Sequence, residues 1–164
     1  MLKVETGSDN QILRTKSVPI PKIVAKHQAL IDEMRETMQR EDGVGLAAPQ
    51  VGQNIRLILV TLVNAKERAI VPMINPEILR ISEKEVCLEE GCLSLPGKFA
   101  EVLRSEEITL KYINTKGQEK ILSLSGMNAR VVLHEIDHLD GILFIDRMVE
   151  HIGPLQKLKS KLYL

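Results

Sequence analysis

Long hydrophobic runs and an excess of charge of one sign are both missing from this sequence of 164 residues. No stretch approaches the roughly 20 apolar residues that a helix needs to cross a bilayer. Residues 1–12 contain charges and no apolar run of the kind found in a signal peptide. The 22 basic residues balance the 22 acidic ones, so no broad electrostatic field favours nucleic acid or a membrane surface. We therefore expect a protein that recognises its partners locally and binds no membrane.

Cysteine is scarce as well. The only two cysteines are Cys87 and Cys92, too few for a secreted scaffold held together by disulfides. This cysteine content suits a reducing compartment, and we predict a cytoplasmic protein. Each thiol is then available as a metal ligand, with a buried, unreactive thiol as the simpler alternative and the preferred interpretation for Cys87.

Internal repeats, low-complexity tracts and linkers rich in glycine and serine are also absent. With 44% hydrophobic and 27% charged residues, a chain of this length can form one compact core. We therefore predict a single domain over residues 1–164.

The spacing of apolar residues predicts a mixture of helices and strands. Helical spacing marks an amphipathic helix near the N-terminus, and a run of branched apolar residues marks a buried strand after it. The predicted elements are a helix over 24–40, a loop over 43–52, strands over 55–63, 67–71 and 76–86, a hairpin formed by 108–114 and 119–124, and a helix from about Met127 to before Gly141.

The sharpest pattern is His134-Glu135-Ile136-Asp137-His138, an H-E-x-x-H motif in a segment of helical character. Ser125 suits the N-cap of this helix, and Gly141 suits the left-handed residue after its end. Residues four apart lie on one helix face, so the two imidazoles can reach one metal ion with Glu135 beside them. The motif therefore supplies two metal ligands and a base. Arg130 on the same helix either pairs with a carboxylate or is solvated at the surface.

A catalytic metal site usually has three protein ligands and one open position, so a third ligand is needed. Downstream of His138 the spacing of the longer zinc-peptidase motif fails, because Phe144 stands where a third histidine is expected. Upstream, Cys92 lies in a turn-forming segment, residues 90–96, that can present a thiolate. The downstream candidates are Asp140, Asp146, Glu150 and His151.

Three segments together resemble the motifs of the peptide deformylase family. They are Gly43-Val44-Gly45-Leu46-Ala47-Ala48-Pro49-Gln50, Glu90-Gly91-Cys92-Leu93-Ser94 and the H-E-x-x-H segment, in the order that this family has. The similarity extends from the Leu13-Arg14 region to about Arg147. It implies a hydrolase that removes the formyl group from the N-terminal methionine of nascent proteins and releases formate.

The resemblance also implies roles for single residues and a cofactor. Cys92, His134 and His138 are the implied ligands of one divalent metal ion. Glu135 is the implied catalytic acid and base, while the Gln50 side chain and the Leu93 backbone N–H are implied donors to the reacting oxygen. Thiolate and imidazole ligands suit both zinc and ferrous iron. The family favours Fe(II), with Zn(II) or Ni(II) as alternatives in purified protein.

The implied substrate is a nascent N-formylmethionyl peptide, bound in an extended form like an added strand, with its methionine side chain in an apolar pocket. Any apolar residue assigned to that pocket suits the plain core equally well. The residues expected to line this region are Gly43, Gly45, Leu88, Gly91, Leu93, Met127 and Val131.

We expect an α+β fold in which short, mainly antiparallel strands pack around a central helix carrying H-E-x-x-H, with an N-terminal amphipathic helix and a C-terminal helix. Leu155, Leu158 and Leu162 recur at helical spacing in that last helix. Lysines lie among them, and the family resemblance suggests a transient contact with the ribosome, with core docking or fraying as the simpler alternative. We expect a monomer.

Two positions depart from the family pattern. Leu133 stands just before the H-E-x-x-H motif, where the family commonly has glutamine, and Phe99 stands where many members have arginine. Neither change affects the metal ligands. A phenyl ring at position 99 cannot contact peptide carbonyls as a cation does, so substrate preference is the property in question.

Two other classes of protein compete with this interpretation. An endopeptidase with H-E-x-x-H needs a third ligand downstream and an extended cleft. A noncatalytic module stabilised by a metal ion is expected to lack Glu135 or to close the site with a fourth ligand, for which Cys87 is the obvious candidate.

Overall fold

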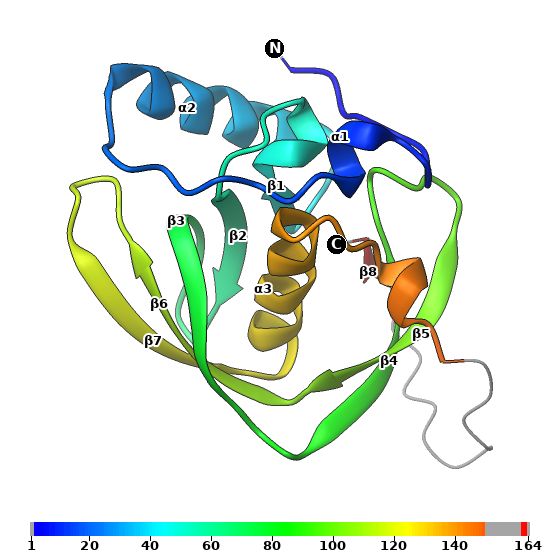
Figure 1. Cartoon of the computed structure of the whole chain (residues 1–164). Coiled ribbons are helices and arrows are strands. Elements are labelled where there is room, and N and C mark those ends of the chain that lie inside the picture. The colour runs from blue at the N-terminus through cyan, green and yellow to red at the C-terminus, as the bar shows by residue number, and fades with distance from the viewer. Residues whose placement is uncertain (1, 150–161, 164) are drawn as a thin grey trace.

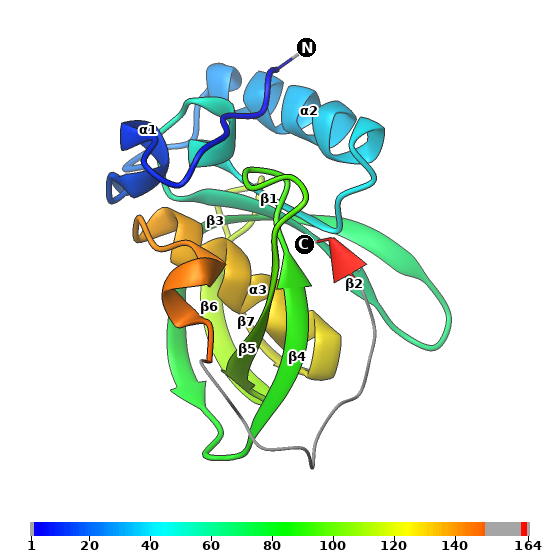
Figure 2. The same ribbon diagram turned by 90° about the vertical axis from the view of Figure 1, so that its right-hand side faces the viewer.

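The computed structural model describes residues 2–149 and 162–163. Two sheets surround one helix, α3, and a second long helix covers the far side of the larger sheet (Figures 1 and 2). The elements are α1 (Gln11–Arg14), α2 (Ala25–Arg40), β1 (Gly45–Ala47), η1 (Ala48–Val51), β2 (Leu57–Val63), β3 (Arg68–Ile81), β4 (Glu85–Gly91), β5 (Phe99–Ser105), β6 (Glu107–Ile113), β7 (Glu119–Ser125), α3 (Gly126–Leu139), η2 (Phe144–Arg147) and β8 (Leu162–Tyr163).

The larger sheet has the strand order β1-β2-β3-β6-β7, and each neighbouring pair is antiparallel. The smaller sheet has the order β5-β4-β8, with β4 and β5 antiparallel and β8 parallel to β4. The expectation of an α+β fold with mainly antiparallel strands is confirmed. None of the helices within the described residues is long and apolar enough to span a bilayer.

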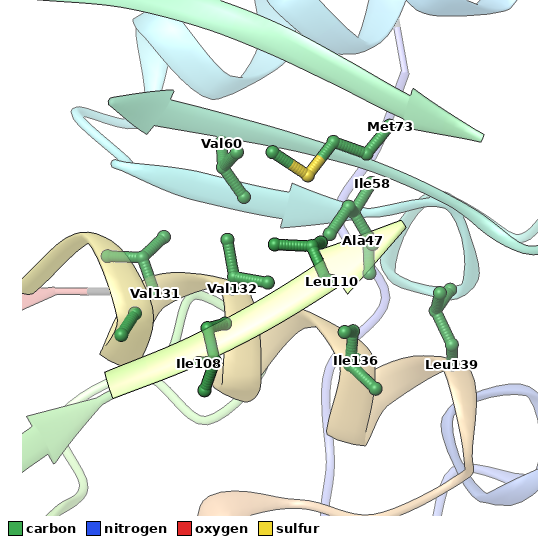
Figure 3. Packing of buried hydrophobic residues seen from close by; sticks show 11 residues of the cluster. Ala47, Ile58, Val60, Met73, Ile108, Leu110, Val131, Val132, Ile136 and Leu139 are labelled. Carbon is green, nitrogen blue, oxygen red and sulfur yellow. The ribbon is translucent and has the colours of Figure 1, made fainter. Parts of the chain in front are cut away.

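Strand β2 is buried on both faces, which explains its continuous apolar run. Its side chains alternate between the two sides of the sheet. Ile58 and Val60 pack toward α3, while Leu57 and Leu59 pack with the buried face of α2. The core on the α3 side consists of Ala47, Ile58, Val60, Met73, Ile108, Leu110, Ala129, Val131, Val132, Ile136 and Leu139 (Figure 3).

Helix α3 begins and ends close to the predicted positions. Ser125 occupies the N-cap as predicted, although its side chain makes no capping hydrogen bond. The Gly126 N–H is instead bound to the Glu106 carbonyl oxygen at 2.8 Å, which ties the start of the helix to the β5–β6 connection. At the other end Gly141 has φ of 74°, the left-handed conformation expected of a glycine after a helix.

The predicted strands over 67–71 and 76–86 are wrong as separate elements. Strand β3 runs without a break from Arg68 to Ile81, and β4 begins only at Glu85. Asn75 and Pro76, where the second of these strands is expected to begin, form an irregularity within β3, and the register with β6 shifts between Ile74 and Glu77. Asn75 takes φ of 50° there, and its amide group bonds the backbone of Ile20, which compensates for the interrupted ladder.

Two further predictions need correction. The segment 43–52 is not a plain loop, because it contains β1 and the short 3-10 helix η1. The predicted C-terminal helix falls mostly on residues 150–161, which lie outside the described residues. Leu162 itself belongs to β8, so a helix over that position is wrong.

Candidate metal centre

Cys92, His134 and His138 come together in the interior. One ligand atom from each residue lies within 4.8 Å of the others, and within the described ranges no other group of His, Cys, Asp and Glu is arranged in this way. All three side chains are buried. Cys92 follows directly after β4, whereas the histidines stand one turn apart on α3. The site therefore joins the end of one sheet to the helix that packs on the other.

The geometry of the three side chains fits a single ion. The His138 Nε2 atom lies 3.2 Å from Cys92 Sγ, and the two imidazole centroids are 5.0 Å apart. His134 Nε2 is buried and has no hydrogen-bond partner among the described residues. One sulfur and two imidazole nitrogens form the type of donor set that binds zinc or ferrous iron.

The protonation of these groups also agrees with a role in metal binding. Burial raises the pKa of the Cys92 thiol to about 12, although the Ser94 backbone N–H bonds the sulfur and opposes the shift. The thiolate therefore forms only where a cation stabilises it. Burial, with a smaller contribution from His134, holds the pKa of His138 well below its usual value. His138 is thus the neutral imidazole that a metal ion requires.

Glu135 lies beside the ligands with its carboxyl group completely buried. Neither carboxyl oxygen has a hydrogen-bond partner among the described residues. Burial raises the pKa of Glu135 well above its usual value, although Arg104 opposes the shift. Backbone of β1 lies against this carboxyl group, since a Cβ added at Gly45 would contact Glu135 Cδ at 2.8 Å and Cγ at 2.9 Å.

Gln50 is fixed at the edge of the same site. Its Oε1 accepts a hydrogen bond from the Ala47 N–H at 2.8 Å, which orients the amide. Its Nε2 donates to Ser94 Oγ at 3.2 Å and approaches Cys92 Sγ at 3.5 Å. Leu93 lies between Cys92 and Ser94, with its side chain next to Gly43. Both implied donors are therefore adjacent to the sulfur ligand.

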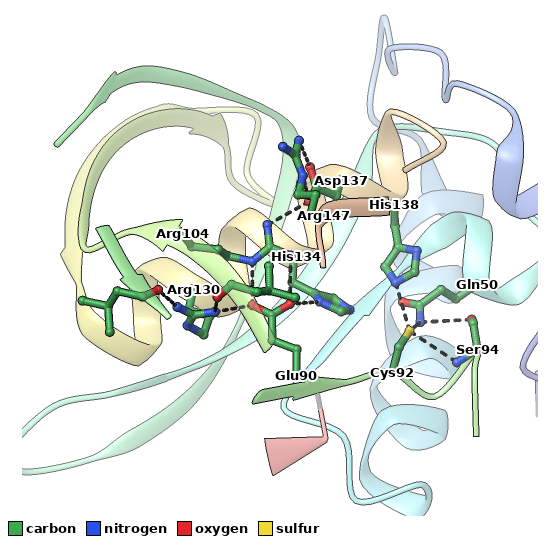
Figure 4. A network of polar contacts seen from close by, with 12 residues as sticks. Gln50, Glu90, Cys92, Ser94, Arg104, Arg130, His134, Asp137, His138 and Arg147 are labelled. Atoms are coloured by element: carbon green, nitrogen blue, oxygen red, sulfur yellow. Dashed lines mark hydrogen bonds and ion pairs between the residues drawn. The ribbon is translucent and has the colours of Figure 1, made fainter. Parts of the chain in front are cut away.

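Glu90 stands behind His134 and was missed as a functional residue in the sequence (Figure 4). Its Oε2 lies 3.0 Å from His134 Nδ1. Arg104 binds both oxygens, with Nε to Oε1 at 2.6 Å and Nη2 to Oε2 at 2.9 Å. Burial alone would raise the pKa of Glu90, but the hydrogen bonds from His134 and Arg104 hold it below its usual range. An ionised Glu90 accepts the Nδ1 proton of His134 and leaves the Nε2 lone pair for a metal ion.

The same network continues along α3 to the chain that follows it. Asp137 binds Arg104 Nη1 at 2.8 Å and accepts two hydrogen bonds of 2.6 Å from Arg147. Arg130 is 3% exposed and binds Glu90, so the interpretation in which it pairs with a carboxylate is correct. Two signals in the sequence could have revealed the network. Glu90 lies two residues before Cys92, and Arg130 lies one helical turn before His134.

The alternative ligands are not at the site. Asp140 pairs with Arg56 at 2.8 Å, and Asp146 pairs with Arg14. Glu150 and His151 lie outside the described residues. Cys87 is buried on β4 and does not belong to the cluster, so no fourth ligand closes the site within the described chain.

The residues expected to bind substrate lie on the two sides of this centre or in the adjacent core. Gly43 and Gly45 are on or next to β1, and Leu88 and Gly91 are on β4. Val131 is part of the core between α3 and the larger sheet, and Met127 packs against that core. Phe99 pairs with Gly91 across β4 and β5, with its ring 2.7 Å from where a Cβ of residue 91 would be. Only glycine leaves room for that ring.

Comparisons with known proteins agree on one family. The family described as polypeptide deformylase matches residues 1–152. The peptide deformylase of Halothermothrix orenii is 46% identical over 138 residues, which cover 84% of this chain and 88% of the relative. That of Chlorobium luteolum is 47% identical over 151 residues, covering 90% and 78%.

Solved structures show the same similarity. The crystal structure of peptide deformylase from Thermotoga maritima superposes with a TM-score of 0.83 at 42% identity, over 91% of this chain and 98% of that one. The Synechococcus elongatus enzyme in complex with actinonin gives a TM-score of 0.84 at 36% identity, over 91% and 79%.

Proposed function

This chain belongs to the peptide deformylase family of metal-dependent hydrolases, which remove N-formyl groups from nascent polypeptides, and we propose that Cys92, His134 and His138 hold the metal ion of this reaction. The observation that carries the assignment is the buried convergence of these three donors, one directly after β4 and two on α3. We further propose that residues 1–164 form one catalytic domain.

We propose Fe(II) as the physiological ion, with Zn(II) or Ni(II) able to replace it in purified protein. The donor set suits each of these metals, and affinity order alone would favour zinc over iron, so availability decides. When bound, the ion supplies Lewis acidity and lowers the pKa of water next to it.

Glu135 is the proposed acid and base. Its carboxyl group is buried beside the ligands, and burial raises its pKa, which favours a group that both accepts and returns a proton. One Glu135 oxygen accepts the proton of the attacking water as the water oxygen bonds to the formyl carbon. The same carboxyl group then donates that proton to the amine nitrogen as the C–N bond breaks. Formate and a free N-terminal methionine are the products.

Gln50 and Leu93 are the proposed donors to the formyl oxygen. Charge develops on this oxygen in the transition state, and fixed donors stabilise it without reorganisation. The Ala47 N–H holds the Gln50 amide so that its NH2 group points toward the sulfur ligand. The Leu93 N–H follows Cys92 directly in the chain. Each donor of this kind typically contributes about 3 kcal/mol to the barrier reduction.

The peptide is proposed to bind as an extended strand between β1 and β4. Strand β1 is at the edge of the larger sheet, next to Glu135, and β4 ends beside Cys92. Because β8 pairs with β4 at Glu90 and Gly91, the peptide would compete with β8 for this edge of β4. In this arrangement the glycines allow close approach of a second backbone. The residues proposed to line the path are Gly43, Gly45, Leu88, Gly91, Met127 and Val131. Phe99, next to Gly91, would give the peptide an apolar contact in place of a charged one.

The test is formate release from formyl-Met-Ala-Ser by protein loaded anaerobically with Fe(II). We expect the parent and Glu36→Gln, an exposed carboxylate on α2, to release formate at the same rate, and Glu135→Ala to release none. A folded, metal-loaded parent that releases no formate would refute the assignment. Cleavage within the peptide would instead identify an endopeptidase, and tight binding without hydrolysis a noncatalytic module.

Three further expectations stay proposals. The protein is proposed to be a cytoplasmic monomer, which fractionation and sedimentation velocity can test. Its basic C-terminal segment is proposed to contact the ribosome transiently. Cosedimentation with ribosomes, in parallel with a variant in which Lys157, Lys159 and Lys161 are replaced by glutamine, tests that contact.

A further inference from the structure

We propose that Arg130 is a positioning residue for the metal centre: it anchors Glu90 to the backbone of β4 and β5, and Glu90 in turn holds His134 in the orientation that binds the ion. The inference rests on the proposed role of His134 as a ligand. Among the described residues, the Arg130 guanidinium binds the Glu90 carboxylate and the carbonyl oxygens of Val102 and Val86, none of which is a proposed ligand.

Arg130 and His134 hold the two ends of one carboxylate. They are four residues apart on α3 and therefore lie on the same face, one turn from each other. Arg130 Nη1 donates to Glu90 Oε1 at 2.5 Å, and Glu90 Oε2 lies 3.0 Å from His134 Nδ1 (Figure 4). A displacement of the Arg130 end of the carboxylate therefore moves the oxygen that orients the imidazole.

Arg130 differs from the other arginine on Glu90 in what else it binds. Its guanidinium donates to the Val102 carbonyl oxygen at 3.1 Å and to the Val86 carbonyl oxygen at 2.5 Å. These carbonyls belong to β5 and β4, so Arg130 connects the helix that carries the histidines to the strand that leads into Cys92. Among the described residues Arg104 makes no such contact with the backbone, because its side chain binds the carboxylates of Glu90 and Asp137.

Charge balance and position are thus supplied by different residues. Arg104 binds both oxygens of Glu90, so we expect the carboxylate to stay ionised when Arg130 is removed. Loss of Arg130 then leaves the charge of Glu90 compensated by Arg104. Among the described residues, however, no other guanidinium connects the Glu90 carboxylate to the backbone carbonyls of Val102 and Val86. The expected defect is a misplaced His134 ring, not a lost charge. Contacts of this kind behind metal ligands typically account for a 10- to 100-fold change in affinity.

The experiment compares three variants by metal affinity. Arg130→Met removes the guanidinium, Arg130→Lys keeps the charge without the fork, and Arg56→Met is the matched control. Arg56 pairs with Asp140 at the end of the same helix at 2.8 Å and has no contact with Glu90. The dissociation constant for Co(II) is measured by competition with a chelator, the Co(II) absorption spectrum reports ligand geometry, and urea unfolding of metal-free protein reports stability.

We expect Arg130→Met to raise the Co(II) dissociation constant about 10- to 100-fold and to shift the absorption bands. Arg130→Lys should lie between it and the parent. Arg56→Met should lower stability while leaving the affinity and the spectrum unchanged. In combination with Glu90→Gln, Arg130→Met should add less than its separate effect, because both changes release the same imidazole.

A dissociation constant for Arg130→Met within twofold of the parent overturns the proposal, as does an unchanged spectrum. If Arg130→Met does not fold, the same criteria apply to Arg130→Lys. His134→Ala distinguishes failure here from failure of the proposed function. Metal binding at full affinity by His134→Ala would refute the assignment of His134 as a ligand. If His134→Ala loses metal binding while the Arg130 variants bind with normal affinity, only the role of Arg130 is refuted.

Discussion

Replacing Gly45 by alanine should disable Glu135 without removing the metal ion. Neither Gly45 nor Gly43 is among the described glycines with positive φ, so alanine causes no backbone strain at either position. The added Cβ at position 45, however, would lie 2.8 Å from Glu135 Cδ and 2.9 Å from Cγ. Carbon atoms normally approach to about 3.5–4.0 Å. The carboxyl group must therefore retreat by roughly 0.6–1 Å.

The magnitude follows from that displacement. Glu135 is completely buried, so the surrounding core limits how it can rotate away. A misplacement of about 1 Å at a reacting group can reduce the rate about 100-fold, which corresponds to about 2.7 kcal/mol of barrier. We expect kcat for formyl-Met-Ala-Ser to fall by this factor. Formate release by the metal-loaded variant measures the rate, and metal analysis of the same sample confirms that the ion is retained.

Gly43→Ala is the matched comparison. A Cβ at position 43 would meet Leu93 Cδ1 at 3.0 Å, and Met38 Cγ and the Gly45 carbonyl oxygen at 3.4 Å, so only the end of the Leu93 side chain has to shift. We expect a smaller effect, seen in KM more than in kcat. A Gly45→Ala variant that binds metal and keeps kcat within threefold of the parent would show that β1 does not confine Glu135.

Three other outcomes are expected. Gln50→Ala should lower kcat about 100- to 1,000-fold with metal content unchanged, because a donor to the formyl oxygen is lost; single-turnover formate release measures this. Burial, followed by the charge of Lys26, lowers the pKa of His27, whose Nδ1 accepts the Val24 N–H at the start of α2. Below about pH 6.5 the unfolded chain binds a proton at His27 more readily than the folded chain does. The stability of the parent should therefore fall as the pH drops. In urea unfolding, His27→Gln, which retains an acceptor, should show a flatter decline of stability with pH. Replacing the two residues of β8 by proline removes N–H groups from the pairing with Glu90 and Gly91. Steady-state kinetics should then show a lower KM at unchanged kcat, because the peptide no longer competes with β8. An unchanged KM would show that β8 does not compete.

Local patterns in the sequence foretell the parts of the site that depend on local geometry. The spacing of His134 and His138 defines one helix face whatever the rest of the fold does. The contact of Cys92 with that face depends on β4 and α3 meeting in space. Composition alone could name the thiol as a candidate, and only the motif resemblance could choose it.

The network behind the ligands could not be predicted in the same way. Arg130 and Glu90 are 40 residues apart in the chain, and Glu90 and Arg104 meet because β4 and β5 pair. No periodicity encodes such partners. Strand β3 shows a related limit. Asn75 and Pro76 carry the chemistry of a turn, yet the residues before them pair with β2 and those after them pair with β6, so the strand continues through both.

The meeting of β4 and α3 at the proposed metal centre also makes the ion a reversible cross-link. Cys92 and His138 are 46 residues apart, and an ion that holds both closes a loop of that length. By the chain-entropy relation for disulfides, such a closure is equivalent to about 4 kcal/mol. The ligands that serve hydrolysis would therefore also tie the smaller sheet to α3. Oxidation of Cys92, the single sulfur in this cross-link, would then lower both the activity and the resistance of the folded chain to unfolding.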